Sequence, residues 1–185
     1  MGTPMVFVRL TGCNLWSGRE AERAQAVCSF CDTDFVGGDR MSAEEMIGRI
    51  AKLPGPRWVC FTGGEPTLQL DVELLQRLRE RGYRIALETN GTLDIEPLRS
   101  LLDWICVSPK SEPLAVSSGD ELKLVYRGQS DEAIRRYEAL AFTHFLLQPE
   151  WGERYQEQLS GTLAFLQRQA RWRLSLQTHK LIGLR

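Results

Sequence analysis

Three cysteines near the start of the chain carry its clearest chemical signal: Cys13, Cys28 and Cys31. Fourteen residues separate the first two, and two separate the second pair. A structural zinc ion normally takes four protein ligands, whereas an iron–sulfur cluster held by three thiolates keeps one iron open for a further ligand. A redox dithiol would need only the Cys28–Cys31 pair. The chemistry of this loop therefore depends on what else the chain supplies.

A zinc site would need a fourth ligand from the remaining cysteines and histidines. The candidates are Cys60, Cys106, His144 and His179. Cys60 and Cys106 lie within apolar segments of strand length, where a buried and inert thiol is the common outcome. On spacing alone, an iron–sulfur cluster and a zinc site stay about equally open.

Polar residues follow four of the apolar segments, where the predicted strands end. The motifs are Thr62-Gly-Gly-Glu-Pro66, Glu88-Thr-Asn-Gly91, Ser108-Pro-Lys110 and Gln148-Pro149. Each has an ordinary explanation, because Gly-Gly and Asn-Gly form tight turns and a lysine after a strand is commonly solvated. Ligands of parallel α/β sheets bind at the carboxyl ends of strands. Four such motifs together with a thiol-rich loop therefore indicate a binding site.

Segments of strand length alternate with helical patterns along the chain. The predicted strands are 5–10, 58–62, 84–88, 104–108, 122–126, 145–148 and 173–177. The predicted helices begin at Ser42, where Glu45 completes a capping box, at about Asp71, after Ser130 and at about Arg154. A short exposed helix is expected over 19–25.

This alternation predicts an α/β fold in a single domain covering residues 1–185. Six or seven strands are too few for an eight-stranded barrel, so we expect an open, partial (β/α) barrel of mainly parallel strands. The long segment at about 11–40 contains all three leading cysteines and has no clear element besides the short helix. A loop of that length in a compact domain is usually functional.

The composition is ordinary for a soluble globular protein. The chain has 185 residues, of which 43% are hydrophobic and 25% charged, and its net charge is −1. This balance gives no electrostatic argument for a nucleic-acid or membrane partner. No apolar run approaches the ~20 residues of a membrane span. Five cysteines fit a complete disulfide framework poorly, so we expect a reducing, cytoplasmic setting.

On these residues, the chain resembles the radical S-adenosylmethionine enzymes. The turns at 63–66, 88–91 and 108–110 look like the cofactor contacts of that superfamily. Its usual cluster motif is CxxxCxxC, and here the first gap is widened to fourteen residues. The wider gap is similar to that of a subset of one family, the 7-carboxy-7-deazaguanine synthases. Stretches 7–16, 28–35, 103–110 and 172–180 look characteristic of this family, and the resemblance covers nearly the whole chain.

The resemblance implies a reaction in queuosine and 7-deazapurine biosynthesis. The family converts 6-carboxy-5,6,7,8-tetrahydropterin to 7-carboxy-7-deazaguanine with release of ammonia. A reduced cluster cleaves S-adenosylmethionine to a 5′-deoxyadenosyl radical, which takes hydrogen from C6 of the pterin. The ring then contracts and the cofactor is regenerated. The implied cofactors are a [4Fe–4S] cluster, S-adenosylmethionine and Mg²⁺.

The resemblance also assigns the cofactor contacts. Cys13, Cys28 and Cys31 would hold the cluster, and its open iron would bind the amino and carboxylate groups of S-adenosylmethionine. The expected S-adenosylmethionine contacts are Phe30, Asp32, Gly64, Glu88, Ser108, Pro109, Lys110, Gln148 and Pro149.

The remaining implied contacts concern the substrate and Mg²⁺. Arg9 and Thr62 match substrate-contacting positions, and the Thr33 hydroxyl would bind Mg²⁺. His179 and the terminal carboxylate at Arg185 would close the substrate pocket. Ordinary readings stay open for three of them: an exposed strand arginine for Arg9, a turn hydroxyl for Thr33 and a satisfied terminal histidine for His179.

Partners follow from the resemblance as well: an electron donor such as flavodoxin or ferredoxin, and a second copy in a homodimer. The family usually opens with a further strand and a Gln-Gly-Glu-Gly segment. We expect that strand, roughly 20 residues with its loop, to be absent here.

Two alternative functions stay open at the level of sequence. A glycyl-radical-enzyme activase would share the cluster, the glycine turn and the fold, without needing Thr33 or the Gln177–Lys180 segment. A zinc-binding α/β domain without enzymatic activity would use the cysteines structurally.

Overall fold

The computed structural model describes residues 3–183. Its seven strands form one sheet, and each strand pairs in parallel with the next along the chain. The strands are β1 (Val6–Leu10), β2 (Trp58–Gly63), β3 (Arg84–Thr89), β4 (Trp104–Val107), β5 (Ser118–Tyr126), β6 (Ala141–Pro149) and β7 (Trp172–Leu174). The described strands leave β1 and β7 as unpaired edges, which confirms the predicted α/β fold as an open, partial barrel.

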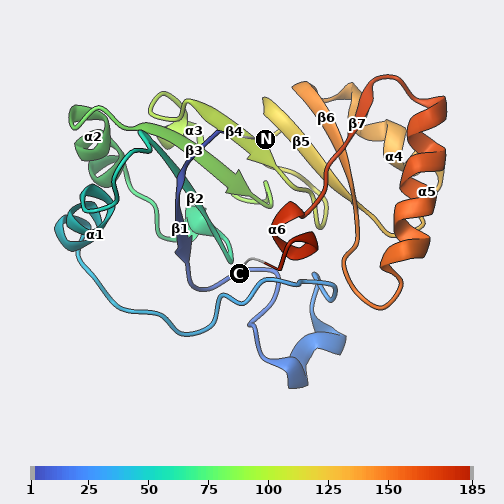
Figure 1. Cartoon of the computed structure of the whole chain (residues 1–185), viewed down its shortest axis with the longest axis horizontal. Coiled ribbons are helices and arrows are strands. Elements are labelled where there is room, and N and C mark those ends of the chain that lie inside the picture. Colours follow the sequence, from blue (N-terminus) through green and yellow to red (C-terminus); the bar gives the residue numbers. More distant parts are fainter. Residues whose placement is uncertain (1–2, 184–185) are drawn as a thin grey trace.

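Helices cover the outer face of this curved sheet (Figure 1). The helices on that face include α1 (Ala43–Ala51), α2 (Val72–Glu80), α4 (Asp131–Arg135) and α5 (Tyr155–Arg168). The remaining helices are α3 (Glu96–Arg99), α6 (Thr178–Leu181) and the 3₁₀ helices η1 (Glu20–Gln25), η2 (Pro66–Leu68) and η3 (Arg136–Ala139). Phe61, Ile85 and Leu87 of the sheet are fully buried, as are Leu75 and Leu78 of α2. The hydrophobic core therefore lies between the sheet and its helices.

The four predicted helix starts are confirmed, and so is the cap predicted at Ser42. Ser42 Oγ accepts a hydrogen bond from the Glu45 backbone N–H at 3.3 Å, and the Glu45 carboxylate accepts one from the Ser42 N–H at 2.7 Å. This is the capping box expected before α1. Asp71 caps α2 by accepting from the Leu74 N–H at 2.8 Å. The short exposed helix expected over 19–25 forms as η1.

Two strands are longer than their apolar segments predict. β5 begins at Ser118 and β6 at Ala141, several residues before the predicted starts. Polar side chains at Asp120, Glu121 and His144 interrupt the apolar pattern in these added residues. Hydrogen bonding to neighbouring strands forms the strand there despite the missing hydrophobic signal.

The inner face of the sheet carries a row of polar residues. Register pairs Arg9 with Thr62, Glu88 with Cys106, Cys106 with Glu121, and Glu121 with His144. Because side chains alternate along a strand, this row faces away from the apolar core. A polar inner face is what a sheet that binds a polar ligand requires.

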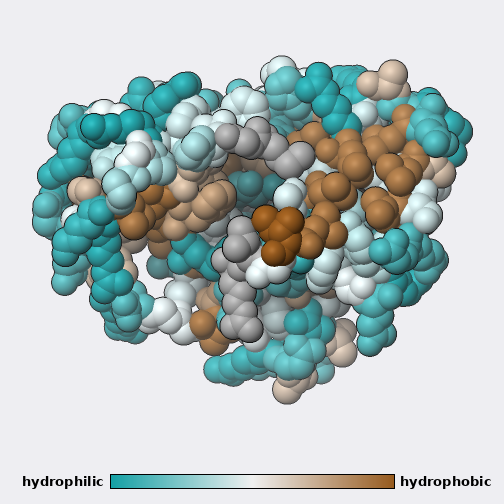
Figure 2. Space-filling model, in the orientation of Figure 1, coloured by the Kyte–Doolittle hydropathy of each residue, from teal (hydrophilic) through white to brown (hydrophobic). Residues whose placement is uncertain are grey.

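The segment at about 11–40, called the cysteine loop below, crosses the carboxyl edge of the sheet, and α6 lies close to that edge (Figure 1). In the same view, Figure 2 shows apolar side chains gathered over β6, β7 and α6 with polar ones around them. Leu181 and Ile182, at the end of α6, are among the exposed large apolar residues. Across residues 3–183, every helix is too short or too polar to span a bilayer.

Candidate active site

The Gly-Gly-Glu-Pro turn holds the start of the cysteine loop against the end of β2. The Gly64 N–H donates to the Leu10 carbonyl at 3.0 Å, and the Glu65 N–H donates to the Gly12 carbonyl at 2.8 Å. A Cβ on Gly64 would lie 2.0 Å from the Gly12 oxygen, and one on Gly63 would lie 2.1 Å from the Leu10 oxygen. Glycine is therefore required by this close approach as well as by the turn.

Glu65 joins this turn to the end of β3. Its side chain is fully buried. One carboxylate oxygen accepts from the hydroxyls of Thr67 and Thr89, each at 2.7 Å, and the other accepts from the Asn90 N–H at 2.7 Å. Sequence reasoning gave Glu65 no role of its own. These bonds make it the connection between two of the four predicted binding turns.

A second set of hydrogen bonds ties the residue after Cys13 to the same end of β3. Asn90 Nδ2 donates to Asn14 Oδ1 at 3.0 Å, and Asn14 Nδ2 donates to Thr92 Oγ1 at 2.8 Å. The Thr92 hydroxyl donates to Asn90 Oδ1 at 2.6 Å. The Asn-Gly turn thus anchors the cysteine loop in addition to reversing the chain.

The three predicted cysteine ligands are free thiols on this anchored loop. Cys28 is buried, and Cys13 and Cys31 are half-buried. The Cys28 N–H donates to the Leu15 carbonyl at 3.2 Å, which brings the Cys28–Cys31 pair back beside Cys13 across the fourteen-residue gap. The Leu15 N–H donates to Cys13 Sγ at 3.4 Å.

Protonation differs among these thiols because they interact. A hydrogen bond from the Cys28 thiol lowers the pKa of Cys31 to about 6, and the same bond raises the pKa of Cys28. Burial raises the pKa of Cys13. One sulfur of the three therefore has the thiolate character that binding to iron requires.

This donor set fits a [4Fe–4S] cluster. In such a cluster each thiolate binds a different iron. Within residues 3–183, no three His, Cys, Asp or Glu side chains are placed to bind a single common ion. Three thiols on a loop fixed against a glycine turn match the ligand number of a cluster with one open iron.

Arg23, from inside the fourteen-residue gap, holds the Cys28–Cys31 turn. Its Nη1 donates to the carbonyls of Ser29 and Cys31, each at 2.9 Å. Its guanidinium lies 4.1 Å from the centre of the Trp16 ring. Sequence reasoning did not single out Arg23, since an arginine in a charged, exposed helix resembles any solvated one.

Asp32, expected on the adenosine side, joins the cysteine loop to the C-terminal segment. Its carboxylate accepts from Gln177 Nε2 at 2.8 Å and forms an ion pair with Lys180. Burial alone would raise the pKa of Asp32, but the bonds from Lys180 and Gln177 lower it overall. Gln177 Oε1 is buried and, within the described residues, has no partner.

Thr33 lines a cavity of about 270 Å³ next to this junction. The cavity is lined by Trp16, Gly18, Arg23, Cys31, Asp32, Thr33, Asp34 and Val36. The cavity offers a threonine hydroxyl and two carboxylates, and it has space for several waters. These are oxygen ligands of the kind that Mg²⁺ takes.

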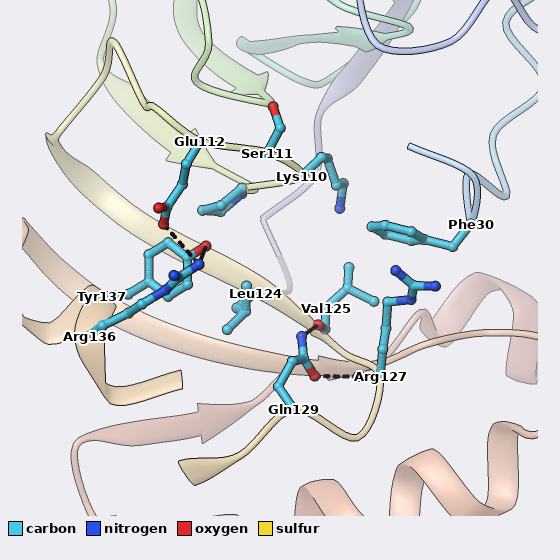
Figure 3. Close-up of a pocket in the computed structure, with 11 residues that line it drawn as sticks. Phe30, Lys110, Ser111, Glu112, Leu124, Val125, Arg127, Gln129, Arg136 and Tyr137 are labelled. Atoms are coloured by element: carbon cyan, nitrogen blue, oxygen red, sulfur yellow. Dashed lines mark hydrogen bonds and ion pairs between the residues drawn. The ribbon is translucent and has the colours of Figure 1, made fainter. Parts of the chain in front are cut away.

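The end of β4 faces a second cavity, of about 200 Å³ (Figure 3). Phe30, Pro109 and Lys110, three of the predicted cofactor contacts, line it. Lys110 Nζ donates to Ser108 Oγ at 2.9 Å and lies 5.4 Å from the centre of the Phe30 ring. Arg127, which the sequence did not single out, lies 4.0 Å from the same ring.

The other predicted contacts also lie at strand ends. Glu88 forms an ion pair with Lys123 at 2.7 Å, and Gln148 Oε1 accepts from the Ser175 hydroxyl at 3.3 Å. Pro149 ends β6 and is buried.

Of the predicted substrate contacts, Arg9 and Thr62 are register neighbours on β1 and β2. His179 lies on α6 and is exposed. Arg185 lies outside the described residues.

Comparison with known proteins then gives the family. The model of the "Radical SAM superfamily" matches residues 24–140, more than half of the chain. The match begins after Cys13, which the widened gap separates from the other two cysteines.

Two curated relatives, both called 7-carboxy-7-deazaguanine synthase, match almost end to end. The protein of Bordetella pertussis is 46% identical over 194 residues, covering 99% of this chain and 90% of the relative. The protein of Bradyrhizobium diazoefficiens is 47% identical over 195 residues, covering 100% and 91%. The chain belongs to the 7-carboxy-7-deazaguanine synthase family of radical S-adenosylmethionine proteins.

Solved structures support the fold of this family member. The crystal structure of QueE from Escherichia coli matches with a TM-score of 0.72 at 22% identity, covering 95% of this chain and 86% of that one. Streptococcus suis SuiB bound to S-adenosylmethionine matches with a TM-score of 0.57 at 16% identity, covering 94% and 47%. At these identities the likeness is one of fold.

Proposed function

We propose that this protein converts 6-carboxy-5,6,7,8-tetrahydropterin to 7-carboxy-7-deazaguanine with release of ammonia, as a lyase of queuosine and 7-deazapurine biosynthesis. The observation that carries the proposal is the near full-length match to synthases of that name at 46–47% identity. The glycyl-radical activase and the zinc domain have no comparable support.

We assign one set of residues to the cofactors and another to the substrate. Cys13, Cys28 and Cys31 would hold the cluster, which together with S-adenosylmethionine supplies one-electron radical chemistry. Phe30 and Asp32 of the expected S-adenosylmethionine contacts lie on the cysteine loop, and the others lie along the carboxyl ends of β2, β3, β4 and β6, on the side that this loop crosses. Arg9 would face the substrate carboxylate from β1, and Thr62 would contact the substrate from β2.

Mg²⁺ is part of the proposal. Support comes from the cavity beside Thr33 and from the Gln177 side chain, whose amide nitrogen donates to Asp32 and whose oxygen has no partner among residues 3–183. An acceptor in that position suits the hydrogen of a metal-bound water. The ion would orient the substrate and neutralise charge that develops on it.

We further propose a flavodoxin or ferredoxin as electron donor, a homodimer and a cytoplasmic location. Each comes from the family resemblance, and the reducing setting agrees with five unpaired cysteines.

The test is an anaerobic assay of reconstituted protein with 6-carboxytetrahydropterin, S-adenosylmethionine, Mg²⁺ and dithionite as the electron donor. Chromatography with mass detection should find 7-carboxy-7-deazaguanine, and C28A should form none because two thiolates do not retain a working cluster. Protein loaded with about four irons and four sulfides that forms no deazaguanine would refute the proposal. One zinc per chain and no iron would favour the zinc domain instead.

A further inference from the structure

Lys123, on the inner face of β5, contacts two of the strand-end turns at once. Its Nζ lies 2.7 Å from Glu88 Oε2 at the end of β3. Its backbone carbonyl accepts a hydrogen bond from Ser108 Oγ at 2.9 Å. Ser108 Oγ also accepts from Lys110 Nζ at 2.9 Å. One residue therefore joins the Glu-Thr-Asn-Gly turn to the Ser-Pro-Lys turn.

The ion pair between Lys123 and Glu88 reaches across a whole strand. Glu88 belongs to β3 and Lys123 to β5, and β4 lies between them with Cys106 beside Glu88 in register. The Lys123 side chain is 16% exposed and that of Glu88 is 36% exposed. Salt screens such a partly buried pair less than it screens a surface pair, so the attraction between the two groups persists at physiological ionic strength.

A competing partner for Lys123 is already engaged. Glu121 lies two residues before it on the same face, and Glu121 Oε1 accepts from the Cys106 thiol at 3.3 Å. Burial would lower the pKa of Lys123, but the neighbouring Cys106, Glu88 and Glu121 raise it. Burial would raise the pKa of Glu88, and Lys123 lowers it overall. Both members of the ion pair are therefore charged at neutral pH.

We propose that Lys123 is a positioning residue of the S-adenosylmethionine site. Its ammonium holds the Glu88 carboxylate in place, and its carbonyl orients the Ser108 hydroxyl. Neither contact requires Lys123 to touch the cofactor. The inference rests on the proposed function, in which Glu88 and Ser108 contact S-adenosylmethionine.

Equilibrium dialysis of S-adenosylmethionine against reconstituted protein tests this role. K123M should raise the Kd for S-adenosylmethionine about tenfold or more while leaving the iron content unchanged, since a charged hydrogen bond is lost. K123R keeps the charge and should bind within about threefold of wild type. K52M, at an exposed lysine after α1, is the matched control and should bind as wild type does.

A double-mutant cycle separates positioning from general damage. If Lys123 acts through Glu88, K123M should weaken binding much less in an E88Q background than in wild type. An equal loss in both backgrounds, or a K123M protein that binds S-adenosylmethionine as wild type does, would overturn the inference. If K123M does not retain its cluster, K123Q takes its place in the same cycle.

Failure of the inference is distinguishable from failure of the proposed function. Wild-type protein that forms deazaguanine beside a K123M protein with unchanged affinity would refute the role of Lys123 alone. Wild-type protein that binds S-adenosylmethionine, forms no deazaguanine and loses affinity on K123M would refute the reaction and keep the positioning role.

Discussion

Glu65 and Thr89 meet at 2.7 Å in a fully buried hydrogen bond that joins the glycine turn to the end of β3. The same carboxylate accepts from the Asn90 N–H. Because Asn90 also bonds to Asn14, next to Cys13, the cysteine loop, the glycine turn and β3 form one connected unit. Loss of any of these hydrogen bonds should therefore be felt at the cysteine loop.

Replacing Glu65 with Gln should destabilise the fold. The amide nitrogen would face donors from Thr67, Thr89 or Asn90, and an unsatisfied buried donor costs about 1–3 kcal/mol. We expect the free energy of unfolding to fall by about 3 kcal/mol, measured by denaturant titration of the apoprotein. E80Q, at an exposed position of α2, is the control and should change little. Equal stability of the two variants would contradict the role of Glu65.

Gly64 and Gly48 form a matched pair for the close approach of the loop. A Cβ on Gly64 would lie 2.0 Å from the Gly12 oxygen, whereas one on Gly48 in α1 has no atom within 4 Å. G64A should lose about 2 kcal/mol or more of unfolding free energy and lose its cluster. G48A should gain about 0.5–1 kcal/mol, as alanine does in a helix. Thermal unfolding and iron content measure both, and a G64A protein as stable as G48A would refute the argument.

Arg23 should control how well the loop holds its cluster. R23M removes both hydrogen bonds to the Ser29 and Cys31 carbonyls, so we expect less iron per chain after reconstitution and faster loss of the cluster's absorbance in air. R19M removes a neighbouring exposed arginine and should retain wild-type iron content. Similar cluster loss in the two variants would show that the hydrogen bonds of Arg23 do not stabilise the cluster-binding loop.

The cysteines of the apoprotein should react with iodoacetamide in a fixed order. The pKa of Cys31 is lowered to about 6 and that of Cys60 is raised to about 12, and only the thiolate reacts. At pH 7 Cys31 should be alkylated first, with Cys60 and Cys106 protected by burial. The rate of Cys31 alkylation should fall as the pH drops through about 6, because the Cys31 thiolate takes up a proton. Peptide mass mapping measures this order. Faster labelling of Cys60 than of Cys31 would contradict the prediction.

The fold followed from the sequence because its apolar segments and helix caps are local signals. Ser42 caps α1 as predicted, α2 begins next to Asp71 as predicted, and each predicted strand has a counterpart in the sheet. The starts of β5 and β6 were missed because Glu121 and His144 belong to the inner face, where polar side chains replace apolar ones. A hydrophobic pattern does not detect strand residues whose exposed face is polar.

The residues of the candidate site that belong to sequence motifs could be predicted. Those whose role depends on contacts made in the fold could not. The cysteines, the glycine turn and the strand-end residues stand out by spacing. Glu65, Arg23 and Lys123 do not, because their partners lie up to 35 residues away and are known only once the chain is folded. Asp32 was expected on the adenosine side, and its bonds to Gln177 and Lys180 became visible only in the fold.

The most direct measurement is anaerobic turnover, by dithionite-reduced protein, of pterin substrate carrying deuterium at C6, with mass detection of the deazaguanine and of S-adenosylmethionine. If the three-cysteine loop serves the proposed reaction, 7-carboxy-7-deazaguanine should form in excess over S-adenosylmethionine consumed, and deuterium should enter the recovered S-adenosylmethionine. Cluster-loaded protein that forms no deazaguanine, or that leaves S-adenosylmethionine unlabelled during turnover, would contradict this mechanism.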